Sequence, residues 1–474
     1  MKKLFSLIKL MLLLCLVLLL MLMLSKVFRP KKTDFPNDTT NKVQGFYALE
    51  DHSIDVLFLG TSHTYYGFNP AVIYMETGLN SYVFAGECQP IGVTYHYLVE
   101  AYKTQSPKLI VLDTFALLPS ADVCQTNGII KVNLEDLRFS QNKVEALKLI
   151  KGENLLENVI DISIYKNRWN EIDLSDFTSV FSESFNPYFG YTDGFPVDEP
   201  IYERYGYFGN EMLVPDLEEL EYLYKIFELA KEHGSEVLLV KTPYYETEKE
   251  YQITNYVFKE AREYGFKTIN FNQYYEELDY IFDRDGDVWH CNVRGAWKIS
   301  KMLSDYISEN YPISIQESIY DQQYKELLYK TMCPMLWYQY DAERYLNQLQ
   351  EFDVTLLVHW NGKPYTVITE EQWNLFYQLG ISRFDIHNDY IAAVSSAQTV
   401  FEHSQNDGFS IDFDVNGVPV SCTSDGSLFQ FVYEGMPVEY NHAGLNLIII
   451  DNNTHKVIDR LAFDLEWIFR ILRY

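Results

Sequence analysis

One short stretch near the amino terminus most constrains the fold. Residues 55–63 read Asp-Val-Leu-Phe-Leu-Gly-Thr-Ser-His, so four apolar residues are followed at once by Gly60 and a turn of small residues. Such an apolar run is typical of a buried strand, and glycine allows the backbone to turn sharply. The turn would place the hydroxyl of Ser62 in the crevice at the carboxyl end of a parallel sheet, where open α/β sheets bind their ligands.

Strand and helix patterns then alternate as far as residue 309. Apolar runs predict strands at 80–86, 108–113, 236–240 and 267–270, and helical patterns cover 72–78, 91–103, 217–233, 254–264 and 295–309. This alternation implies an α/β unit with a parallel sheet. Residues 120–210 are irregular, aromatic and charged, and we expect them to form an insertion over the active edge of the sheet.

A second stretch far downstream supplies a candidate base. It reads Asp287-Val-Trp-His290-Cys-Asn292. A serine hydroxyl becomes a nucleophile when an imidazole takes its proton, and the imidazole needs a carboxylate to fix its tautomer. Ser62 alone is more often structural, and an Asp-x-x-His pair alone is more often incidental. Their order, one at the first strand and one before the last helix, favours a site with Ser62 as nucleophile, His290 as base and Asp287 as its orienting carboxylate.

An acyl-transfer site also needs donors for the oxyanion. The candidates are the amide of Ser62, the loop at Gly86 and the side chain of Gln89. His63 is adjacent to the nucleophile, where the geometry seldom suits a base, so we expect it to be a packing or hydrogen-bonding residue.

Composition limits the classes of ligand and partner that the chain is expected to bind. The 474 residues exceed one ordinary domain, and the formal net charge is −29. Nucleic-acid binding needs clustered Lys and Arg, so nucleic acid is not expected. No cysteine pair has metal-ligand or Cys-x-x-Cys spacing, so neither a disulfide framework nor a metal or other cofactor is expected. The cysteines are Cys15, Cys88, Cys124, Cys291, Cys333 and Cys422.

The amino terminus predicts a membrane anchor. The segment from Leu4 to Leu24 is apolar except for Ser6 and Lys9, and the lysine can snorkel at the membrane edge. No small-x-small cleavage site follows, so an uncleaved anchor within residues 1–32 is favoured over a cleaved signal peptide. Basic residues flank both sides, so charge does not decide the orientation. Residues 33–50 are polar and are expected to form a stalk.

Residues 51–315 resemble the SGNH/GDSL hydrolase superfamily. Phe58-Leu-Gly-Thr-Ser62-His63 is similar to its first block, and Asp287-Val-Trp-His290 is similar to its last block. The membrane-anchored branch associated with cell-surface polysaccharides is the most similar. The resemblance implies a flavodoxin-like three-layer α/β/α fold and a serine acyl-enzyme on Ser62, with His290 and Asp287 in the roles given above. It maps the glycine of the second block to Gly86, whereas the asparagine block has no clear match.

Residues 318–474 are expected to form a smaller α+β domain. Patterns predict helices at 321–349 and 369–379, strands at 353–358, 390–395 and 444–451, and a hairpin at 411–422 around Asn416-Gly417. The unit resembles the domain of the interleukin-like epithelial–mesenchymal transition inducers, also found in the stem of a protein-mannose N-acetylglucosaminyltransferase. That resemblance implies carbohydrate binding. A domain that only packs or spaces remains the alternative, since His359, His387 and His442 are scattered.

These observations predict a single-pass membrane enzyme with most of its chain outside the cytoplasm. It would be an O-acyltransferase or esterase acting on acyl groups of a cell-surface glycan, and a membrane-bound partner could supply the acyl group. The alternative is a non-catalytic glycan-binding or assembly protein of polysaccharide export that keeps the same fold.

Overall fold

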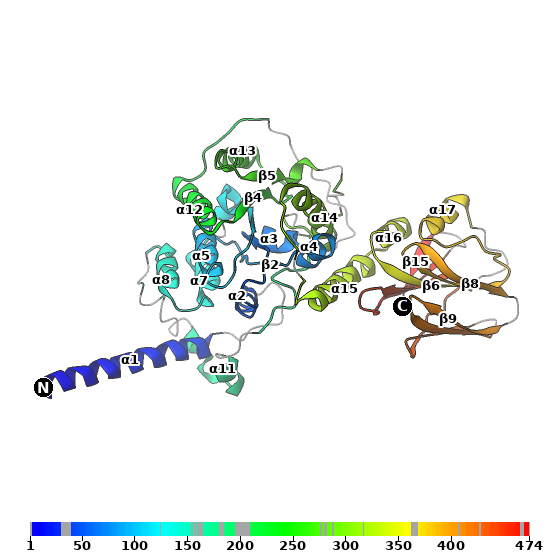
Figure 1. Cartoon of the computed structure of the whole chain (residues 1–474), viewed down its shortest axis with the longest axis horizontal. Helices are drawn as coiled ribbons and strands as arrows, with labels where there is room; N and C mark the ends of the chain where they lie inside the picture. The colour runs from blue at the N-terminus through cyan, green and yellow to red at the C-terminus, as the bar shows by residue number, and fades with distance from the viewer. Residues whose placement is uncertain are drawn as a thin grey trace. The chain divides into compact units, whose positions relative to one another are not determined.

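The chain consists of two compact units with a boundary between Tyr320 and Asp321 (Figure 1). The computed structural model describes residues 2–29, 39–123, 125–152, 155, 158, 165–179, 184–194, 209–274, 277–278, 282–286, 289–315, 317–361, 368–405, 408–425, 428–464 and 469–473.

A parallel sheet forms the centre of the first unit, as predicted. Its order is β2-β1-β3-β4-β5, which is the order of flavodoxin-type sheets. All neighbouring strands are parallel, and Phe58 lies opposite Val83 on one side and Val111 on the other. The strands are β1 (Val56–Leu59), β2 (Ser81–Val83), β3 (Leu109–Asp113), β4 (Glu236–Lys241) and β5 (Lys267–Asn270).

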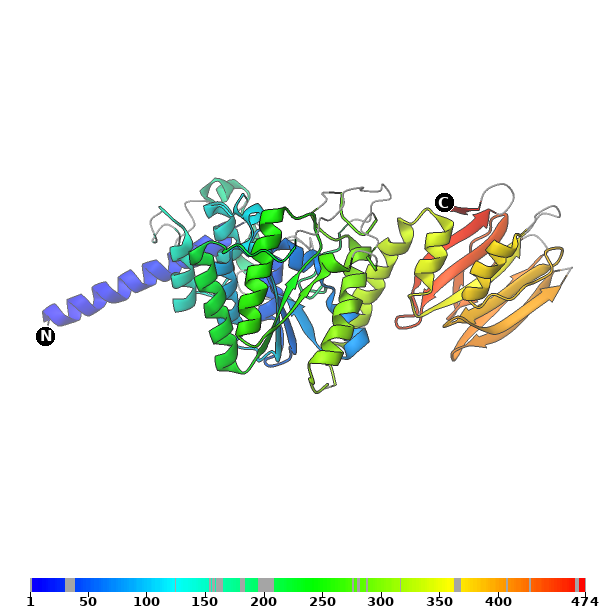
Figure 2. The same ribbon diagram turned by 90° about the horizontal axis from the view of Figure 1, so that it is seen from above.

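Helices cover both faces of this sheet (Figures 1 and 2). Phe58, Val111 and Val240 pack on one face against Ile299 and Leu303 of α14, in a core that also includes residues of α4. Helices α5 and α12 pack against each other, and α12 also contacts β4. The helices are α4 (Pro70–Thr77), α5 (Ile91–Ala101), α12 (Leu217–His233), α13 (Glu248–Glu263) and α14 (Val293–Asn310).

The helix ends follow local sequence rules. Helix α12 has the predicted bounds, with Asp216 as its N-cap and Gly234 in the left-handed conformation at its end. Helix α13 begins six residues before the prediction, because Thr247 and Glu250 form a reciprocal capping box. That spacing is visible in the sequence and could have located the true start.

The amino-terminal region differs from the prediction. Helix α1 (Lys2–Phe28) is apolar, and Lys3–Phe28 is long enough to cross a membrane, although a signal sequence would pass the same test. The predicted stalk at 33–50 is wrong from residue 39 onward, because α2 (Thr39–Tyr47) packs into the unit. Phe46 is fully buried and stacks on Phe84 with ring centroids 4.1 Å apart. Residues 30–38 lie outside the described part.

The insertion at 120–210 is partly helical where it is described, whereas residues 184–194 and 209–210 are irregular, as predicted. Thr126 and Ser140 cap two of its helices through their side chains, a signal that the sequence contained. The elements are α6 (Pro119–Asp122), α7 (Asn127–Glu135), α8 (Gln141–Ala146), η3 (Lys166–Asn170) and α11 (Leu174–Ser179). Residues 184–194 cross the edge of the sheet, since Thr192 N donates to Tyr65 O and Val293 N donates to Gly194 O.

The second unit contains two antiparallel sheets. Their orders are β15-β14-β13-β6-β7-β8 and β12-β11-β10-β9. The predicted hairpin is present, with Val415 paired to Val418. The strands are β6 (Val354–Asn361), β7 (Asp389–Ser395), β8 (Gln398–Gln405), β9 (Phe409–Val415), β10 (Val418–Ser424), β11 (Phe429–Tyr433), β12 (Met436–Val438), β13 (Gly444–Asp451), β14 (Val457–Asp464) and β15 (Arg470–Leu472).

One core lies between the two sheets of this unit. Leu357 and Ile448 from the larger sheet pack in one cluster with Val420 and Phe431 from the smaller one. The predicted helix 321–349 is two helices, α15 (Asp321–Trp337) and α16 (Ala342–Leu349), and the next helix is α17 (Glu370–Gln378). These findings establish an α+β unit and leave its carbohydrate-binding role as a prediction.

Candidate active site

Ser62 lies at the turn between β1 and the short helix α3 (Ser62–Gly67). Gly60 makes this turn with φ = +148°, and a Cβ there would lie 2.2 Å from Oγ1 of Thr64. Only glycine fits both the angle and the space. The Thr61 side chain accepts a hydrogen bond from His63 N at 3.3 Å and caps the helix. Ser62 is therefore fixed at the carboxyl edge of the sheet, where the chain order reverses between β1 and β3.

The structure brings Ser62 and His290 together. His290 Nε2 lies 2.8 Å from Ser62 Oγ, and the Ser62 side chain is buried. This distance is within the range expected between a serine nucleophile and its base. Asp287, the predicted orienting carboxylate, lies outside the described residues, so its role stays a prediction.

Two further rings of α3 lie beside the imidazole of His290. The ring centroids of His63 and Tyr66 are 5.0 and 4.8 Å from that of His290. Both rings are on one face of α3, because residues three apart on a helix are neighbours. His63 also stacks on Phe115 at 3.8 Å. It is a packing residue, as predicted, whereas Tyr66 was missed despite the Ser-His-x-x-Tyr spacing.

Burial lowers the pKa of His63 well below its ordinary value, and the neighbouring His290 and Lys241 act in the same direction. His63 is therefore neutral near pH 7. A neutral ring next to His290 adds no positive charge beside the imidazole that faces Ser62 Oγ.

Hydrogen bonds of the Asn292 side chain hold the loop that carries His290 in place. The side chain of Asn292 donates to the carbonyls of Phe282 at 2.6 Å and Arg284 at 2.8 Å, while its Oδ1 accepts from two amides of α14. Gly295 lies so close to this loop that a Cβ would be 2.3 Å from Asp283 O. Asn292 and Gly295 therefore set the position of His290, and sequence reasoning gave neither residue this role.

The structure bears on one of the predicted oxyanion donors, Gln89, while the roles of the Ser62 amide and Gly86 stay predictions. Gly86 follows β2, next to the strand that leads to Ser62. Gln89 is fully buried and its amide donates to Thr94 Oγ1 at 2.9 Å, so the predicted donor role of this side chain is not supported. Asn133 was not foreseen: it donates to Glu87 O at 2.9 Å, and its Oδ1 occupies the space where a Cβ of Gly86 would lie.

A buried lysine lies behind the site at the end of β4. Lys241 Nζ lies 3.4 Å from the ring centroid of Tyr244, whose ring is 5.0 Å from that of His63. Burial lowers the pKa of Lys241, and the carboxylates of Glu246 and Asp113 oppose this shift. Asp113 itself accepts from Thr242 N and Oγ1 at 3.0 and 2.8 Å. These bonds fix the ends of β3 and β4 beside the site.

No protein-family model matches the chain, and no curated protein sequence matches it. Function is therefore inferred from the geometry of the site and from the residues themselves. In the described part of the chain, no group of three or more His, Cys, Asp or Glu side chains is arranged to hold a metal ion.

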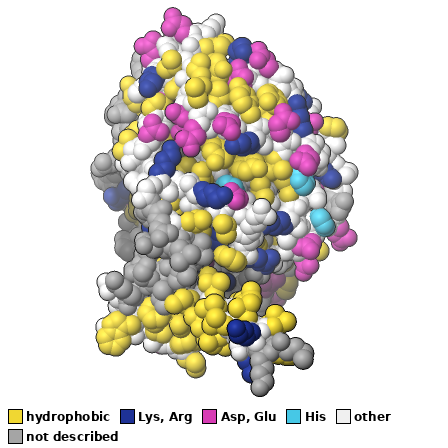
Figure 3. Space-filling model, turned by 90° about the vertical axis from the view of Figure 1, so that its left-hand side faces the viewer, with side chains coloured by type: hydrophobic (Ala, Val, Ile, Leu, Met, Phe, Trp, Pro, Cys, Tyr) yellow, Lys and Arg dark blue, Asp and Glu magenta, His cyan; other side chains and the backbone are white. Residues whose placement is uncertain are grey.

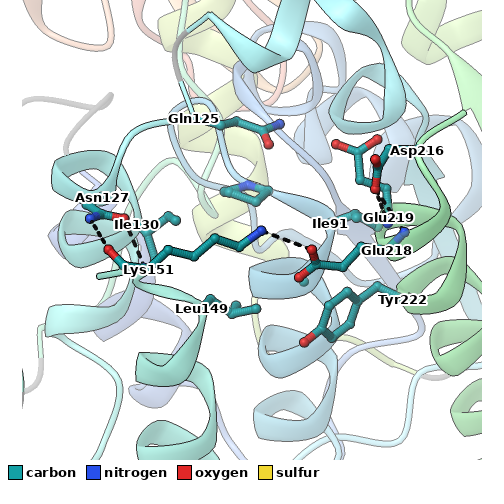
Figure 4. A pocket seen from close by; sticks show the side chains of 12 residues that line it. Ile91, Gln125, Asn127, Ile130, Leu149, Lys151, Asp216, Glu218, Glu219 and Tyr222 are labelled. Carbon is teal, nitrogen blue, oxygen red and sulfur yellow. Dashed lines mark hydrogen bonds and ion pairs between the residues drawn. The ribbon is translucent and has the colours of Figure 1, made fainter. Parts of the chain in front are cut away.

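A cavity of about 280 Å³ lies beside the first turns of α5 and α12 (Figure 4). It is lined by neither Ser62 nor His290. Lys151 reaches across it to Glu218 with a separation of 2.9 Å. Burial and neighbouring carboxylates raise the pKa of Glu219 to about 7. Because Lys151 and Glu218 already satisfy each other, this cavity is not assigned a ligand.

One disulfide is present in the chain, although no disulfide framework was expected from the sequence. Cys88, next to the Gly86 loop, is disulfide-bonded, whereas Cys15, Cys291, Cys333 and Cys422 are free. The sequence did not predict this bond, because its spacing matches no recognisable framework. Disulfides persist mainly in proteins outside the cytoplasm.

Proposed function

We propose that the chain is a membrane-anchored, extracytoplasmic serine acyltransferase or esterase that acts on O-acyl groups of a cell-surface polysaccharide. The observation that carries this proposal is the 2.8 Å separation of Ser62 Oγ and His290 Nε2 at the carboxyl edge of a parallel sheet. The strand order and the two sequence blocks are those expected for an SGNH-type enzyme.

The chemistry would proceed through an acyl-enzyme. Ser62 Oγ attacks the acyl carbonyl while its proton passes to His290 Nε2. The tetrahedral intermediate then expels the leaving oxygen, which takes the proton from His290 and leaves the acyl group on Ser62. In the second half, water or a sugar hydroxyl gives its proton to His290 and attacks the acyl-serine. The bond from the acyl carbon to Ser62 Oγ then breaks, His290 returns the proton to Ser62 Oγ, and the acyl group leaves on the acceptor oxygen. Asp287 would orient the imidazole, and the amides of Ser62 and Gly86 would face the oxyanion.

Two observations support the substrate class and the compartment. Trp289 precedes His290, is 42% exposed, and packs against Tyr244 with ring centroids 5.8 Å apart. Aromatic faces beside a site offer a flat apolar surface against which a sugar ring can pack. The disulfide at Cys88 fits an oxidising location outside the cytoplasm. Transfer is favoured over hydrolysis, since a tether suits an enzyme that modifies polymer during export.

The second unit would bind glycan as an accessory domain. Its α+β architecture and separate core are consistent with an independent binding module. The test for this part of the proposal is binding of surface polysaccharide fragments to the full chain with Ser62 replaced by alanine, which keeps any binding apart from turnover.

The deciding experiment is a mass measurement on Ser62. The purified full chain is incubated with p-nitrophenyl acetate, digested, and the Ser62 peptide is examined for an added acetyl group, with Ser62→Ala as the control. Acetylation at Ser62, absent in the variant, is the expected result. No adduct and no release of nitrophenol with several activated esters would overturn the proposal in favour of a non-catalytic glycan-binding or assembly protein.

A further inference from the structure

Large apolar side chains are exposed beside the carboxyl-terminal end of α1. Trp169 is 72% exposed, Leu174 is 79% exposed and Phe177 is 49% exposed. They belong to η3 and α11, and are called the 169–177 patch below. Figure 3 faces the amino-terminal end of α1 and shows hydrophobic side chains gathered along the lower edge, where α1 is viewed end-on. Three such residues within one short segment are unusual for a surface that faces water.

Polar contacts of Arg168 connect the 169–177 patch to the end of α1. Arg168 Nη1 donates to the carbonyl of Phe28 at 3.0 Å, and Arg168 Nη2 lies 3.1 Å from Asp176 Oδ1. Both η3 and α11 contact α1, and Ser25 and Val27 near the end of α1 are buried. The 169–177 patch is therefore held at the level of the last turn of α1.

That level falls at the boundary of the bilayer if α1 spans it. The uninterrupted apolar run Leu10–Leu24 covers about 22 Å at 1.5 Å per residue, whereas the hydrocarbon region is roughly 30 Å thick. A run this short is accommodated by thinning of the bilayer and by snorkelling of flanking residues such as Lys9, and either places the last turn of α1 at the interface. The 169–177 patch lies beside the end of this run.

We propose that the 169–177 patch lies in the membrane interface and forms a second contact between the first unit and the bilayer. The occupant of the patch is lipid, not a protein partner, because the patch continues the surface of an apolar helix whose own side chains are exposed along its length. Trp and Phe are suited to this depth, where an aromatic ring meets both acyl chains and headgroups. The inference rests on α1 being an uncleaved anchor.

The two contacts together would restrict the rotation of the first unit about α1. A single helix leaves the attached unit free to turn, whereas a helix plus an interfacial segment defines which side faces the lipid. The edge of the sheet that carries Ser62 would thus keep a fixed orientation toward the membrane.

Spin labelling of the full chain in lipid vesicles tests the inference. A nitroxide is attached at Leu174→Cys in a Cys15→Ser background, in which the remaining described free cysteines are buried. The matched control is Leu217→Cys, which is 74% exposed at the start of α12. We expect the ratio of collisions with oxygen to collisions with a water-soluble nickel chelate to be at least three-fold higher at position 174. Equal ratios at the two positions would overturn the inference.

A second measurement keeps the test independent of the cysteine variants. Vesicles of brominated phosphatidylcholine should quench the tryptophan fluorescence of the wild-type chain more than that of Trp169→Phe. Equal quenching would contradict the proposal.

A spin label on the native Cys15 reports whether α1 itself lies in the bilayer. Water-like collisions at Cys15 would mean that α1 does not span the bilayer. Lipid-like collisions at Cys15 together with water-like collisions at position 174 would reject the membrane contact of the patch alone.

Discussion

His290 Nε2 lies 2.8 Å from Ser62 Oγ, although the two residues are 228 positions apart in the chain. The serine comes from the turn after the first strand and the histidine from the loop before α14. A general base typically contributes about 10²- to 10⁴-fold to the rate. We therefore expect His290→Ala to slow acylation of Ser62 by that factor, measured by nitrophenol release from p-nitrophenyl acetate.

The matched control for this prediction is His233→Ala. His233 is exposed at the end of α12, where its ring stacks on Tyr102. This variant should acylate Ser62 at the wild-type rate. An unchanged rate in His290→Ala, with Ser62 still acylated, would show that another group takes the proton.

The loop at Gly86 tolerates no side chain. A Cβ there would lie 1.6 Å from Asn133 Oδ1 and 2.8 Å from Gln89 Oε1. Gly86→Ala should lower the free energy of unfolding by about 1–3 kcal/mol, as overpacking does, and should slow acylation because the loop beside Ser62 must shift. Gly128→Ala is the control. Its Cβ would have no neighbour closer than 3.7 Å, and because Gly128 lies in α7 the alanine should raise the free energy of unfolding by up to about 1 kcal/mol. Both values come from urea denaturation, and equal stability of the two variants would refute the crowding argument.

Helix α2 is part of the first unit and not of a stalk. Phe46 is fully buried between Phe84 and Tyr82. Phe46→Ala should therefore cost about 3–5 kcal/mol of the unfolding free energy, as removal of a buried aromatic ring does. Phe139→Ala, at a position 59% exposed, should cost less than about 0.5 kcal/mol. If thermal and urea unfolding of the Phe46 variant match the wild type, α2 does not pack as described.

Acid should destabilise the second unit through His359. This histidine is fully buried and stacks on Phe429, and burial lowers its pKa to about 3. As the pH falls below about 6.5, this histidine takes up a proton in the unfolded chain but not in the folded chain. The free energy of unfolding is therefore highest above pH 6.5 and falls as the pH drops toward 3. At pH 4.5 the loss is about 2–3 kcal/mol relative to pH 7. His359→Phe should remove this part of the loss, measured by urea denaturation at both pH values. An identical pH dependence in the variant would contradict this origin.

Loss of the Trp289 side chain should weaken the binding of large substrates more than that of small ones. Because it is exposed next to His290, Trp289→Ala should raise KM for an O-acylated oligosaccharide about ten-fold, since a lost stacking contact of about 1.4 kcal/mol gives that factor. The kcat for p-nitrophenyl acetate should stay within about two-fold of the wild-type value. Phe139→Ala, an exposed aromatic residue of the first unit, is the control. A KM unchanged for the oligosaccharide would exclude a stacking role for Trp289.

Much of the first unit could be predicted because its strands are continuous apolar runs that end in turns. The turn at Gly60 located Ser62, and the Asp-x-x-His stretch located His290. The predicted α12 matched the structure because both of its ends carry a strong local signal, at Asp216 and Gly234.

Other features depend on contacts that the sequence does not display. The polar composition around Pro36 suggested a stalk, whereas the position of Phe46 is decided by its contact with Phe84, 38 residues further along. The same holds for Gln89, whose amide was a plausible oxyanion donor until its bond to Thr94 was known. Asn133 carries no signal of its own, because its place beside Gly86 follows from how the insertion packs.

The position of α14 has a consequence for the order of events during folding. This helix packs on α3 and α4 and follows all five strands of the parallel sheet in the chain, so the loop that brings His290 to Ser62 is among the last parts of the first unit to be synthesised. Parallel pairings between distant segments form slowly compared with local ones. A chain halted before residue 290 would carry Ser62 without the imidazole that faces it. The pair at the edge of the sheet is therefore complete only when the first unit is nearly whole.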